Sequence, residues 1–165
     1  MIEINATRKR VGPEQARQNF FWPVLKWGKF RSGADSLFKP YYMVTGTGRN
    51  SLSGRTGGKI VYLSDGLDFD TIKVLGNPLE LETFEVDPHR IIAPRFEAAK
   101  AVAQVRDAFM RDGFFRFKEY PKVDISECRM VYRPFYVFHL TFFGRDLKLY
   151  AYGDSLGQHK VSRRV

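Results

Sequence analysis

The chain contains the stretch Lys39-Pro40-Tyr41-Tyr42-Met43-Val44, and the same pattern returns as Arg133-Pro134-Phe135-Tyr136-Val137-Phe138. Every position of the second stretch matches the first in charge, aromatic ring or hydrophobic character. A second apolar run follows each stretch and ends in an Asp/Gly turn, over residues 60–66 in the first half and 147–154 in the second. Because an internal repeat constrains a fold more than a single motif does, the sequence predicts two similar halves.

Each half is predicted to begin with a helix. The first helix is expected to start near Pro13 and to be short, because Pro23 interrupts it. The second is expected over residues 93–113, where apolar side chains recur near the 3.6-residue period and Gly113 ends the pattern.

The remaining elements of each half are predicted to be strands. Residues 27–31 and 114–118 alternate rings with bases, which is typical of a half-buried strand. Pro40 and Pro134 are expected at the beginning or the edge of a strand, where a missing N–H is tolerated. Connections such as residues 142–145 are too short for a parallel crossover, so we expect antiparallel sheets. We therefore predict an α+β fold of two tandem α-β-β-β repeats with antiparallel sheets packed on helices: residues 1–74, a linker over 75–92, and residues 93–165, together forming one compact unit.

The chain is strongly basic. Its 27 Lys and Arg against 18 Asp and Glu give a net charge of +9 and a pI of about 9.8. This charge favours an anionic partner, such as nucleic acid, an acidic protein or anionic lipid. The alternative is that the charge only keeps the protein soluble. The N-terminal residues lack the pattern of a secretory signal, and no apolar run approaches the ~20 residues that span a bilayer, so we expect a cytoplasmic protein without a membrane span.

Metal, cofactor and catalytic motifs are not recognisable. A single cysteine, Cys128, excludes an internal disulfide and a Cys-based zinc site, and its position between Glu127 and Arg129 suggests a modestly lowered thiol pKa. The three histidines lack metal-ligand spacing, and His139 is expected to be an ordinary histidine of a strand. We predict no catalytic residues, no metal and no cofactor. An enzyme would need a deep pocket that joins His139 with Arg133 or Asp154.

The loop from Gly46 to Gly58 contains five glycines and resembles a phosphate cradle in composition. The phosphate-loop pattern fails, however, because Ile60 rather than Ser or Thr follows Lys59, and the loop leads into a strand. We interpret it as a hairpin insertion that the fold does not need. The alternative is a finger that contacts an anion or a partner through Arg49 and Arg55.

Two binding functions are predicted. The first is a non-catalytic binding or regulatory module for an unknown protein or anionic ligand, with Tyr41, Tyr42, Phe135 and Tyr136 as contacts on an aromatic sheet face. The alternative places these rings in the core. The second is a single-stranded RNA or DNA binder, because rings flanked by bases can stack nucleobases and hold phosphates. Its cations would be Lys29, Arg31, Arg116 and Lys118; alternatively, these strands turn their rings inward and their bases to solvent.

The end of the second half resembles PepSY-like domains, in which a final strand closes in a D-x-x-G turn. Here that turn is Asp154 to Gly157, after the strand over residues 147–152. In the first half Asp65 is followed by Gly66 and Asp68, so the pattern is only loosely kept. The resemblance implies a curved antiparallel sheet wrapped on helices and a binding or inhibitory role. It carries no catalytic residues over to this chain.

Overall fold

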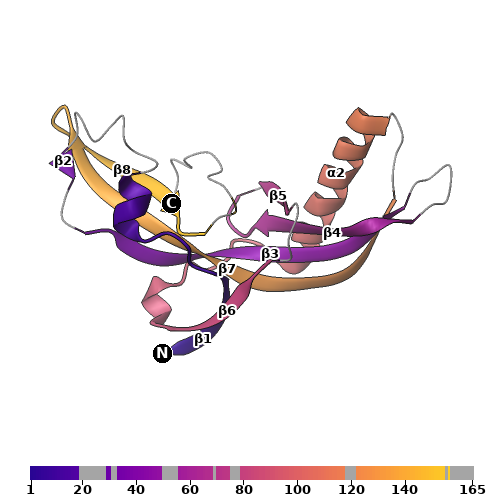
Figure 1. Cartoon of the computed structure of the whole chain (residues 1–165), viewed down its shortest axis with the longest axis horizontal. Helices are drawn as coiled ribbons and strands as arrows, with labels where there is room; N and C mark the ends of the chain where they lie inside the picture. Colours follow the sequence, from indigo (N-terminus) through magenta and orange to yellow (C-terminus); the bar gives the residue numbers. More distant parts are fainter. Residues whose placement is uncertain are drawn as a thin grey trace. The chain divides into compact units, whose positions relative to one another are not determined.

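The protein is a strand-rich α+β protein built on one mixed sheet of eight strands with two helices, one of them long (Figure 1). The computed structural model describes residues 1–18, 29–30, 33–49, 56–68, 70–74, 79–117, 122–154 and 156. The strands are β1 (Ile2–Thr7), β2 (Lys29–Phe30), β3 (Asp35–Arg49), β4 (Thr56–Asp65), β5 (Thr71–Val74), β6 (Leu81–Val86), β7 (Lys122–Phe142) and β8 (Arg145–Tyr152). Residues 13–18 are helical, and they are followed along the chain by a 3-10 turn (Pro88–Arg90) and the long helix α2 (Ala98–Phe117).

The strand order is β5-β4-β3-β7-β1-β6, and β2 and β8 also pair with β7. The pairs β1–β6, β2–β7, β3–β4, β4–β5 and β7–β8 are antiparallel, and Ala6 of β1 pairs in parallel with Tyr132 of β7. None of the helices in the described residues is long and apolar enough to cross a membrane.

The chain divides into two compact units that do not follow the two halves of the sequence. Unit 1 comprises residues 1–39, 80–92 and 132–165, and unit 2 comprises residues 40–79 and 93–131. Each unit therefore combines a β-hairpin from one half with a helix from the other. The prediction of two tandem α-β-β-β repeats was wrong for this reason: the strands repeat, but each helix packs on the hairpin of the opposite half.

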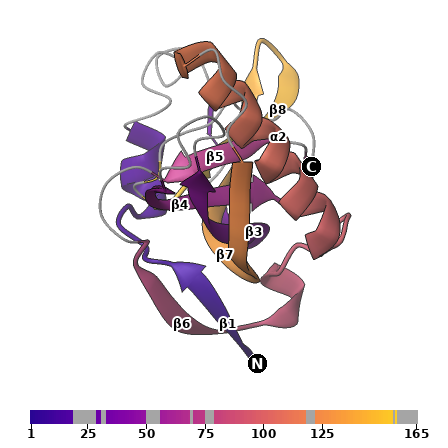
Figure 2. The ribbon, with the colours of Figure 1, turned by 90° about the vertical axis from the view of Figure 1, so that its right-hand side faces the viewer.

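In unit 2, helix α2 packs on the hairpin of β3 and β4 (Figure 2). Tyr42, Val44 and Tyr62 of the hairpin are buried against small side chains of the helix. Alanine side chains let the helix axis approach the sheet closely, which leaves room for the tyrosine rings between them. The helical side chains of this cluster are Ala101, Val105 and Ala108.

In unit 1, the helical residues 13–18 pack in the same way on the hairpin of β7 and β8. Ala16 is fully buried against Tyr136, Phe138 and Ala151. The hairpin pairs from Phe135 with Tyr152 to Phe142 with Arg145. Beside it, β1 and β6 pair along their whole length and form a second small core with Phe38.

The two prolines of the repeated stretch start the two hairpin ladders. The Pro40 carbonyl accepts the Gly66 N–H at 2.9 Å, and the Pro134 carbonyl accepts the Gly153 N–H at 2.8 Å. In an antiparallel pair of this kind, each residue normally donates its N–H to the carbonyl of the other. Proline has no N–H, so the carbonyl of each paired glycine is available to another donor. We expected these prolines at the beginning or edge of a strand; instead they lie inside the long strands β3 and β7, where the pairing with β4 or β8 begins.

The donor to each glycine carbonyl is the segment that enters the helix. The Gly66 carbonyl accepts from the Arg95 N–H at 2.8 Å. The Gly153 carbonyl accepts from the N–H groups of Arg10 and Val11 at 2.8 and 3.0 Å. Each missing proline N–H thus creates a docking point for the chain just before a helix. The repeated stretch builds the same helix-docking junction twice.

Tyrosine hydroxyls complete this junction. Tyr42 donates to the carbonyl of Phe96 at 2.6 Å, and Tyr136 donates to the carbonyl of Val11 at 2.9 Å. Both acceptors lie two residues before the first helical residue of their segment. The second aromatic position of the repeated stretch, Tyr42 or Tyr136, therefore helps to hold a helix on the hairpin.

Three further sequence predictions differ from the structure. Residues 114–117 are helical rather than extended, because α2 continues through Gly113, which costs only about 1 kcal/mol in a helix. Residues 81–86, expected in a linker, form β6 on the edge of the sheet.

The glycine-rich loop is also shorter than predicted, because Gly46 and Gly48 belong to β3. A Cβ at Gly46 would lie 2.6 Å from the carbonyl oxygen of Asp124 in β7, and one at Gly48 would lie 2.6 Å from the ring of Phe109. These glycines permit close packing in unit 2 rather than mobility. Arg49 pairs with Thr56, so the connection itself is limited to residues 50–55, which lie outside the described residues.

Candidate binding site at the tip of the β7–β8 hairpin

The four rings predicted to form an aromatic binding face are interior side chains. The exposed fraction is 2% for Tyr41, 5% for Tyr42, 3% for Phe135 and 0% for Tyr136. Phe135 stacks on Tyr150 with ring centroids 5.5 Å apart. Because these four rings are buried, they do not form a binding face on the protein surface.

The predicted basic contacts are distributed differently. Lys29 is exposed on β2, while the neighbouring Phe30 ring packs edge-on against Phe138 at 6.5 Å. This pair turns its ring inward and its base outward. Of the other predicted cations, Arg31, Arg55 and Lys118 lie outside the described residues, and the side chains of Arg49 and Arg116 are not among those described.

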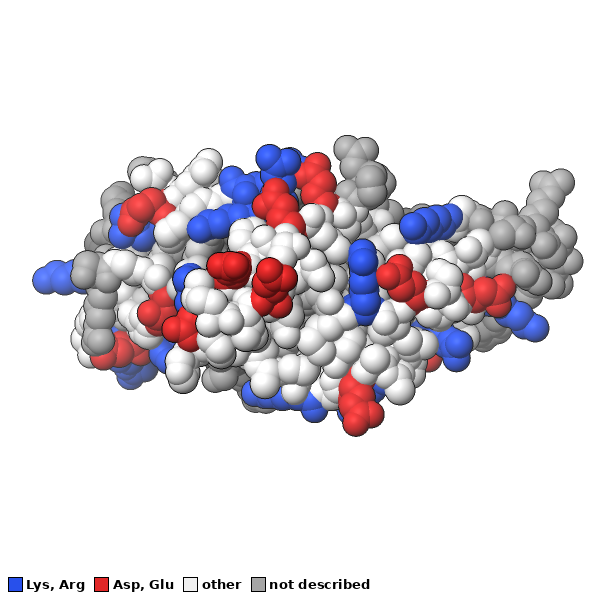
Figure 3. Space-filling model, turned by 90° about the horizontal axis from the view of Figure 1, so that it is seen from below, with Lys and Arg blue, Asp and Glu red and all other residues white. Residues whose placement is uncertain are grey.

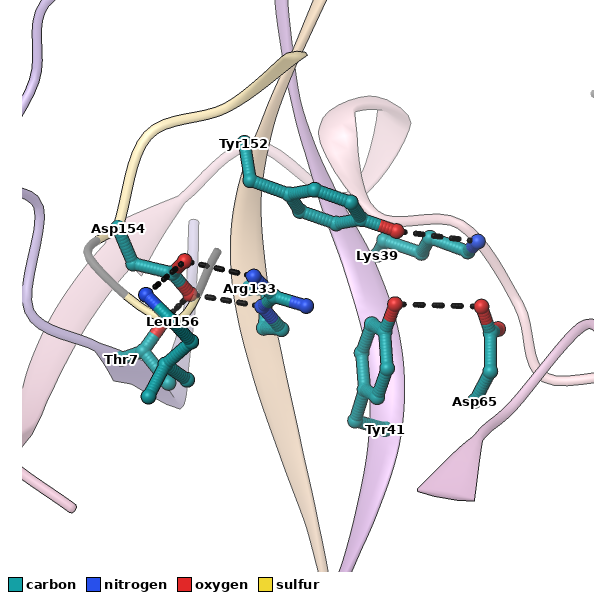
Figure 4. A network of polar contacts seen from close by, with 8 residues as sticks. All are labelled: Thr7, Lys39, Tyr41, Asp65, Arg133, Tyr152, Asp154 and Leu156. Atoms are coloured by element: carbon teal, nitrogen blue, oxygen red, sulfur yellow. Dashed lines mark hydrogen bonds and ion pairs between the residues drawn. The ribbon is translucent and has the colours of Figure 1, made fainter. Parts of the chain in front are cut away.

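A buried ion pair anchors the second hairpin in unit 1 (Figure 4). The Arg133 guanidinium donates from Nε and Nη2 to the two oxygens of Asp154, both at 2.7 Å, and both side chains are almost fully buried. The Thr7 hydroxyl and the Leu156 N–H also donate to this carboxylate, at 2.7 and 3.3 Å. The Tyr152 ring covers the guanidinium at 3.8 Å. The bidentate geometry and the added donors are what a buried ion pair needs to offset its desolvation.

Asp65 is the corresponding acid of unit 2. It accepts from the Tyr41 hydroxyl at 3.2 Å (Figure 4). It also accepts from the N–H of Leu67 at 2.9 Å. Asp154 accepts from the N–H two residues later in the same way. Both acids therefore fix the turn that leaves the hairpin, as expected for aspartate in turns.

His139 and its surroundings form a separate, more exposed feature of unit 1. The His139 ring nitrogen Nε2 lies 2.9 Å from an oxygen of Asp35. A cavity of about 240 Å³ opens here, lined by His139, Leu140, Asp146, Leu147 and Lys148. Arg133 lies six residues earlier in β7, roughly 20 Å along the strand, and is committed to Asp154. The described residues therefore do not assemble the pocket that would have joined His139 with Arg133 or Asp154.

The hairpin tip next to this cavity carries an exposed aromatic ring. Phe143 is 82% exposed and has a φ of 47°, and Gly144 follows with a φ of 74°. Two positive φ angles in a two-residue connection define a type I′ turn, whose first position favours Asn, Asp or Gly. A left-handed conformation costs an ordinary residue about 1 kcal/mol or more. The turn itself therefore does not favour an aromatic residue at Phe143.

Three exposed cations lie on the strands that meet at this turn, and Figure 1 shows β2 and β8 there. Lys29 is paired with Thr141 and Lys148 with His139, so these two cations share one face of the hairpin, whereas Arg145, paired with Phe142, lies on the other face. Within the described part of the chain, none of these three cations forms an ion pair. The nearby carboxylates are already engaged: Asp146 accepts from the Thr141 hydroxyl at 2.9 Å, and Asp35 is held by His139. We call Phe143, Lys29, Arg145, Leu147 and Lys148 the hairpin-tip patch.

The sequence predictions missed all of this patch except Lys29. The available signal was Phe143-Gly144 itself, a tight turn that holds a phenylalanine where a hairpin favours Asn or Asp.

Most of the net positive charge of the chain is carried by residues other than the described ones. The described residues contain 20 Lys and Arg against 17 Asp and Glu, a net +3. The remaining segments contain 7 against 1, a net +6, which completes the +9 of the whole chain. On the face that Figure 3 shows, basic and acidic side chains are interspersed rather than gathered into one basic field.

Two further expectations concern Cys128 and metal binding. Burial raises the pKa of the Cys128 thiol, and the charge of Glu127 raises it further, so the lowered pKa that we expected is wrong. The Arg129 guanidinium is directed to the Glu127 carboxylate at 3.4 Å instead of to the sulfur. Among the described residues, no group of His, Cys, Asp and Glu is arranged to hold a metal ion.

Comparison with known proteins identified no relative: no family model, no curated protein and no solved structure matches this chain.

Proposed function

We propose that this protein is a binding module and that it contacts an anionic partner through the hairpin-tip patch. The observation that carries the proposal is Phe143, an exposed ring in a left-handed turn position. Exposure of the ring to water and the left-handed backbone both disfavour phenylalanine here. Backbone strain of this kind concentrates at functional sites.

The charge around Phe143 supports an anionic partner. Lys29, Arg145 and Lys148 present three exposed cations, and Leu147, which is 42% exposed, adds apolar surface. The neighbouring acids are engaged with Thr141 and His139, which lowers their competition for these cations. Phe143 supplies contact area at the tip, and the three cations on the adjoining strands supply charge complementarity.

The binding role also agrees with the resemblance of the last strand and the Asp154 turn to PepSY-like domains. That resemblance remains a hypothesis, and Gly157 of the D-x-x-G pattern lies outside the described residues. The proposed contact surface differs from the aromatic face of the original prediction, because Tyr41, Tyr42, Phe135 and Tyr136 are buried.

The proposal can be tested with a model polyanion. A Lys29→Gln/Arg145→Gln/Lys148→Gln variant is compared with an Arg106→Gln/Arg111→Gln/Lys122→Gln variant on immobilised heparin. The second variant removes the same charge from exposed positions in unit 2. We expect the first variant to elute at clearly lower salt than the second, since only it loses the patch. Equal elution of the two variants would show that net charge alone governs retention, and the hairpin-tip patch would be rejected as the site.

A further inference from the structure

We propose that His139 is a further binding residue of this site. The face of the hairpin that it shares with Lys29 and Lys148 gains a net positive charge, and so holds the anion, when the His139 ring is protonated. This inference rests on the proposed function: it names the face of the hairpin-tip patch that holds the anion and makes the contact dependent on pH.

The strand register places His139 between the two lysines. His139 of β7 is paired with Lys148 of β8, and Thr141, the next residue of β7 on the same face, is paired with Lys29 of β2. The Cβ atoms of directly paired residues lie about 5 Å apart, and successive residues on one face of a strand lie about 7 Å apart. An anion beside the His139 ring is therefore within reach of both long lysine side chains.

The surface beside the ring is hollow enough to hold such an anion. The His139 side chain is half-buried, and it lines the cavity of about 240 Å³ together with Asp146 and Lys148. About 10–15 Å³ of cavity already holds a water molecule. A sulfate or phosphate group therefore fits next to the imidazole and the lysine.

The charges on this face cancel when His139 is neutral. The charged groups that the described neighbouring strands place there are Lys29 of β2, Asp35 of β3, and Asp146 and Lys148 of β8. Two cations and two carboxylates give no net charge, and protonation of His139 adds one positive charge. The protonation state of a single ring therefore decides whether this face attracts an anion.

The contact with Asp35 decides which ring nitrogen takes the additional proton. An ionised carboxylate can only accept a hydrogen bond, so the 2.9 Å contact requires a proton on Nε2 of His139. The second proton therefore goes to Nδ1, which becomes a new N–H donor. Burial raises the pKa of Tyr150, the next residue of β8 on this face, so its hydroxyl stays neutral.

The direction of the pH dependence follows from this chemistry. Histidine is the side chain whose charge ordinarily changes between pH 5 and 8, whereas lysine and aspartate ordinarily keep their charge over that range. The imidazole is cationic at the acidic end. Binding of an anion on this face should therefore strengthen as the pH falls and weaken as it rises.

The experiment uses the full chain and rhodamine-labelled heparin, with binding followed by fluorescence anisotropy at pH 8.0 and pH 5.5 and one salt concentration. The sulfate groups of heparin stay ionised at both pH values, so a change in affinity comes from the protein. We expect wild type to bind about threefold to fivefold more tightly at pH 5.5, as one added ionic contact gives. His139→Gln should lose most of this increase.

Three variants serve as matched controls. His89→Gln removes an exposed histidine of the same unit, and His159→Gln removes the third histidine of the chain. Both should keep the increase at pH 5.5. Arg145→Gln removes a charge from the opposite face, and it should lower the affinity by the same factor at both pH values because a guanidinium does not titrate.

Two further measurements distinguish binding by His139 from a role in holding β3 on β7 through Asp35. His139→Lys places a permanent cation at the same position, and at pH 8.0 it should bind heparin as tightly as wild type does at pH 5.5. Because binding and protonation are reciprocal, heparin binding near pH 6.5 should be accompanied by proton uptake. Titration calorimetry in two buffers of different ionisation enthalpy measures this uptake, which should be smaller in His139→Gln.

The outcomes separate this inference from the proposed function. If the variant of Lys29, Arg145 and Lys148 elutes from heparin before its charge-matched control, but His139→Gln keeps the full increase at pH 5.5, the proposed site stands and this inference is wrong. It is also wrong if His139→Lys binds no more tightly than wild type at pH 8.0. If the two charge variants behave alike on heparin, the proposed function itself fails.

Discussion

The two hairpins use one docking junction but secure it with different polar groups. In unit 2 a twenty-residue helix covers the hairpin, and the acid Asp65 accepts from the neutral hydroxyl of Tyr41. In unit 1 the described helical segment is only residues 13–18, and Asp154 is paired with the guanidinium of Arg133. The anchor of unit 1 is a bidentate, almost fully buried charge pair, whereas that of unit 2 includes a hydrogen bond from a tyrosine. A repeated stretch of sequence can therefore preserve backbone geometry while the source of stability differs.

The largest expected effect comes from breaking the polar anchor of unit 1. Asp154→Asn should lower the free energy of unfolding by about 3–5 kcal/mol, because it leaves the Arg133 guanidinium buried without its counter-ion. Asp65→Asn should cost less, about 1–2 kcal/mol, since the amide oxygen of Asn can still accept from the Tyr41 hydroxyl and the Leu67 N–H. Urea unfolding followed by circular dichroism measures both. Equal losses would mean that the two anchors do not differ as the comparison requires.

The buried ion pair can also be replaced as a whole. The double variant Arg133→Met/Asp154→Leu should regain part of the stability lost in Asp154→Asn, because it removes both charges from the interior. A double variant that is less stable than either single variant would indicate that the pair also fixes the local conformation.

The next effect comes from the glycines that share the docking junction. Gly66→Ala would place a Cβ 2.9 Å from the Pro40 carbonyl oxygen, and Gly153→Ala would place one 2.9 Å from the Tyr136 hydroxyl. We expect each to destabilise by about 1–3 kcal/mol, as overpacking does. Gly58→Ala, which meets nothing within 4 Å, serves as the control and should be near neutral. The junction would not be equivalent in the two units if only one of the substitutions mattered.

The tyrosine hydroxyls should contribute less, and equally. Tyr42→Phe and Tyr136→Phe each remove one hydrogen bond to the carbonyl that precedes a helix, at a cost of about 1 kcal/mol. Thermal unfolding of the two variants checks this. A loss confined to Tyr136→Phe would show that the helical residues 13–18 depend on this hydroxyl more than α2 depends on that of Tyr42.

The smallest effect is expected at the outer end of the β3–β4 hairpin. Replacing residues 50–55 by a two-residue Asn-Gly turn should change the free energy of unfolding by less than about 1 kcal/mol, because the entropy of loop closure varies slowly with length. The pairing of Arg49 with Thr56 makes these the correct end points. A variant that fails to fold would contradict the view that this connection is dispensable. A folded variant that no longer binds polyanions would show that the connection contributes to binding in addition to the hairpin-tip patch.

The hairpins were predictable from the sequence, but the partners of the helices were not. The repeated Pro and aromatic positions are local patterns, and they correctly indicated two similar strand pairs. Which helix packs on which pair depends on contacts such as that between Val11 and Tyr136, 125 residues apart, and no local period records them. Rings and bases alternate at residues 114–117 with the two-residue period of a strand, yet these residues are helical. A run this short cannot distinguish the period of a strand from the 3.6-residue period of a helix.

The candidate site was only partly predictable for a related reason. An aromatic side chain in a strand has the same sequence signature whether it faces a partner or a helix, so the sequence predicts Tyr42 and Tyr136 as contacts although both are buried. Phe143 was overlooked because its significance depends on a φ of 47°, which follows from the tight pairing of Phe142 with Arg145. Only the conformation of the turn makes that phenylalanine unusual.

The exchange of helices between the halves sets an order of assembly during synthesis. Tyr42 and its helix-side acceptor Phe96 are 54 residues apart, whereas Tyr136 lies 125 residues after Val11. At a synthesis rate of about 5–20 residues per second, Tyr136 is added to the chain roughly 6–25 seconds after Val11. Unit 2 can close while the chain is still growing, but Ala16 must wait for β8 before it has a hairpin to cover. The helical residues 13–18 are therefore made before α2 but buried after it.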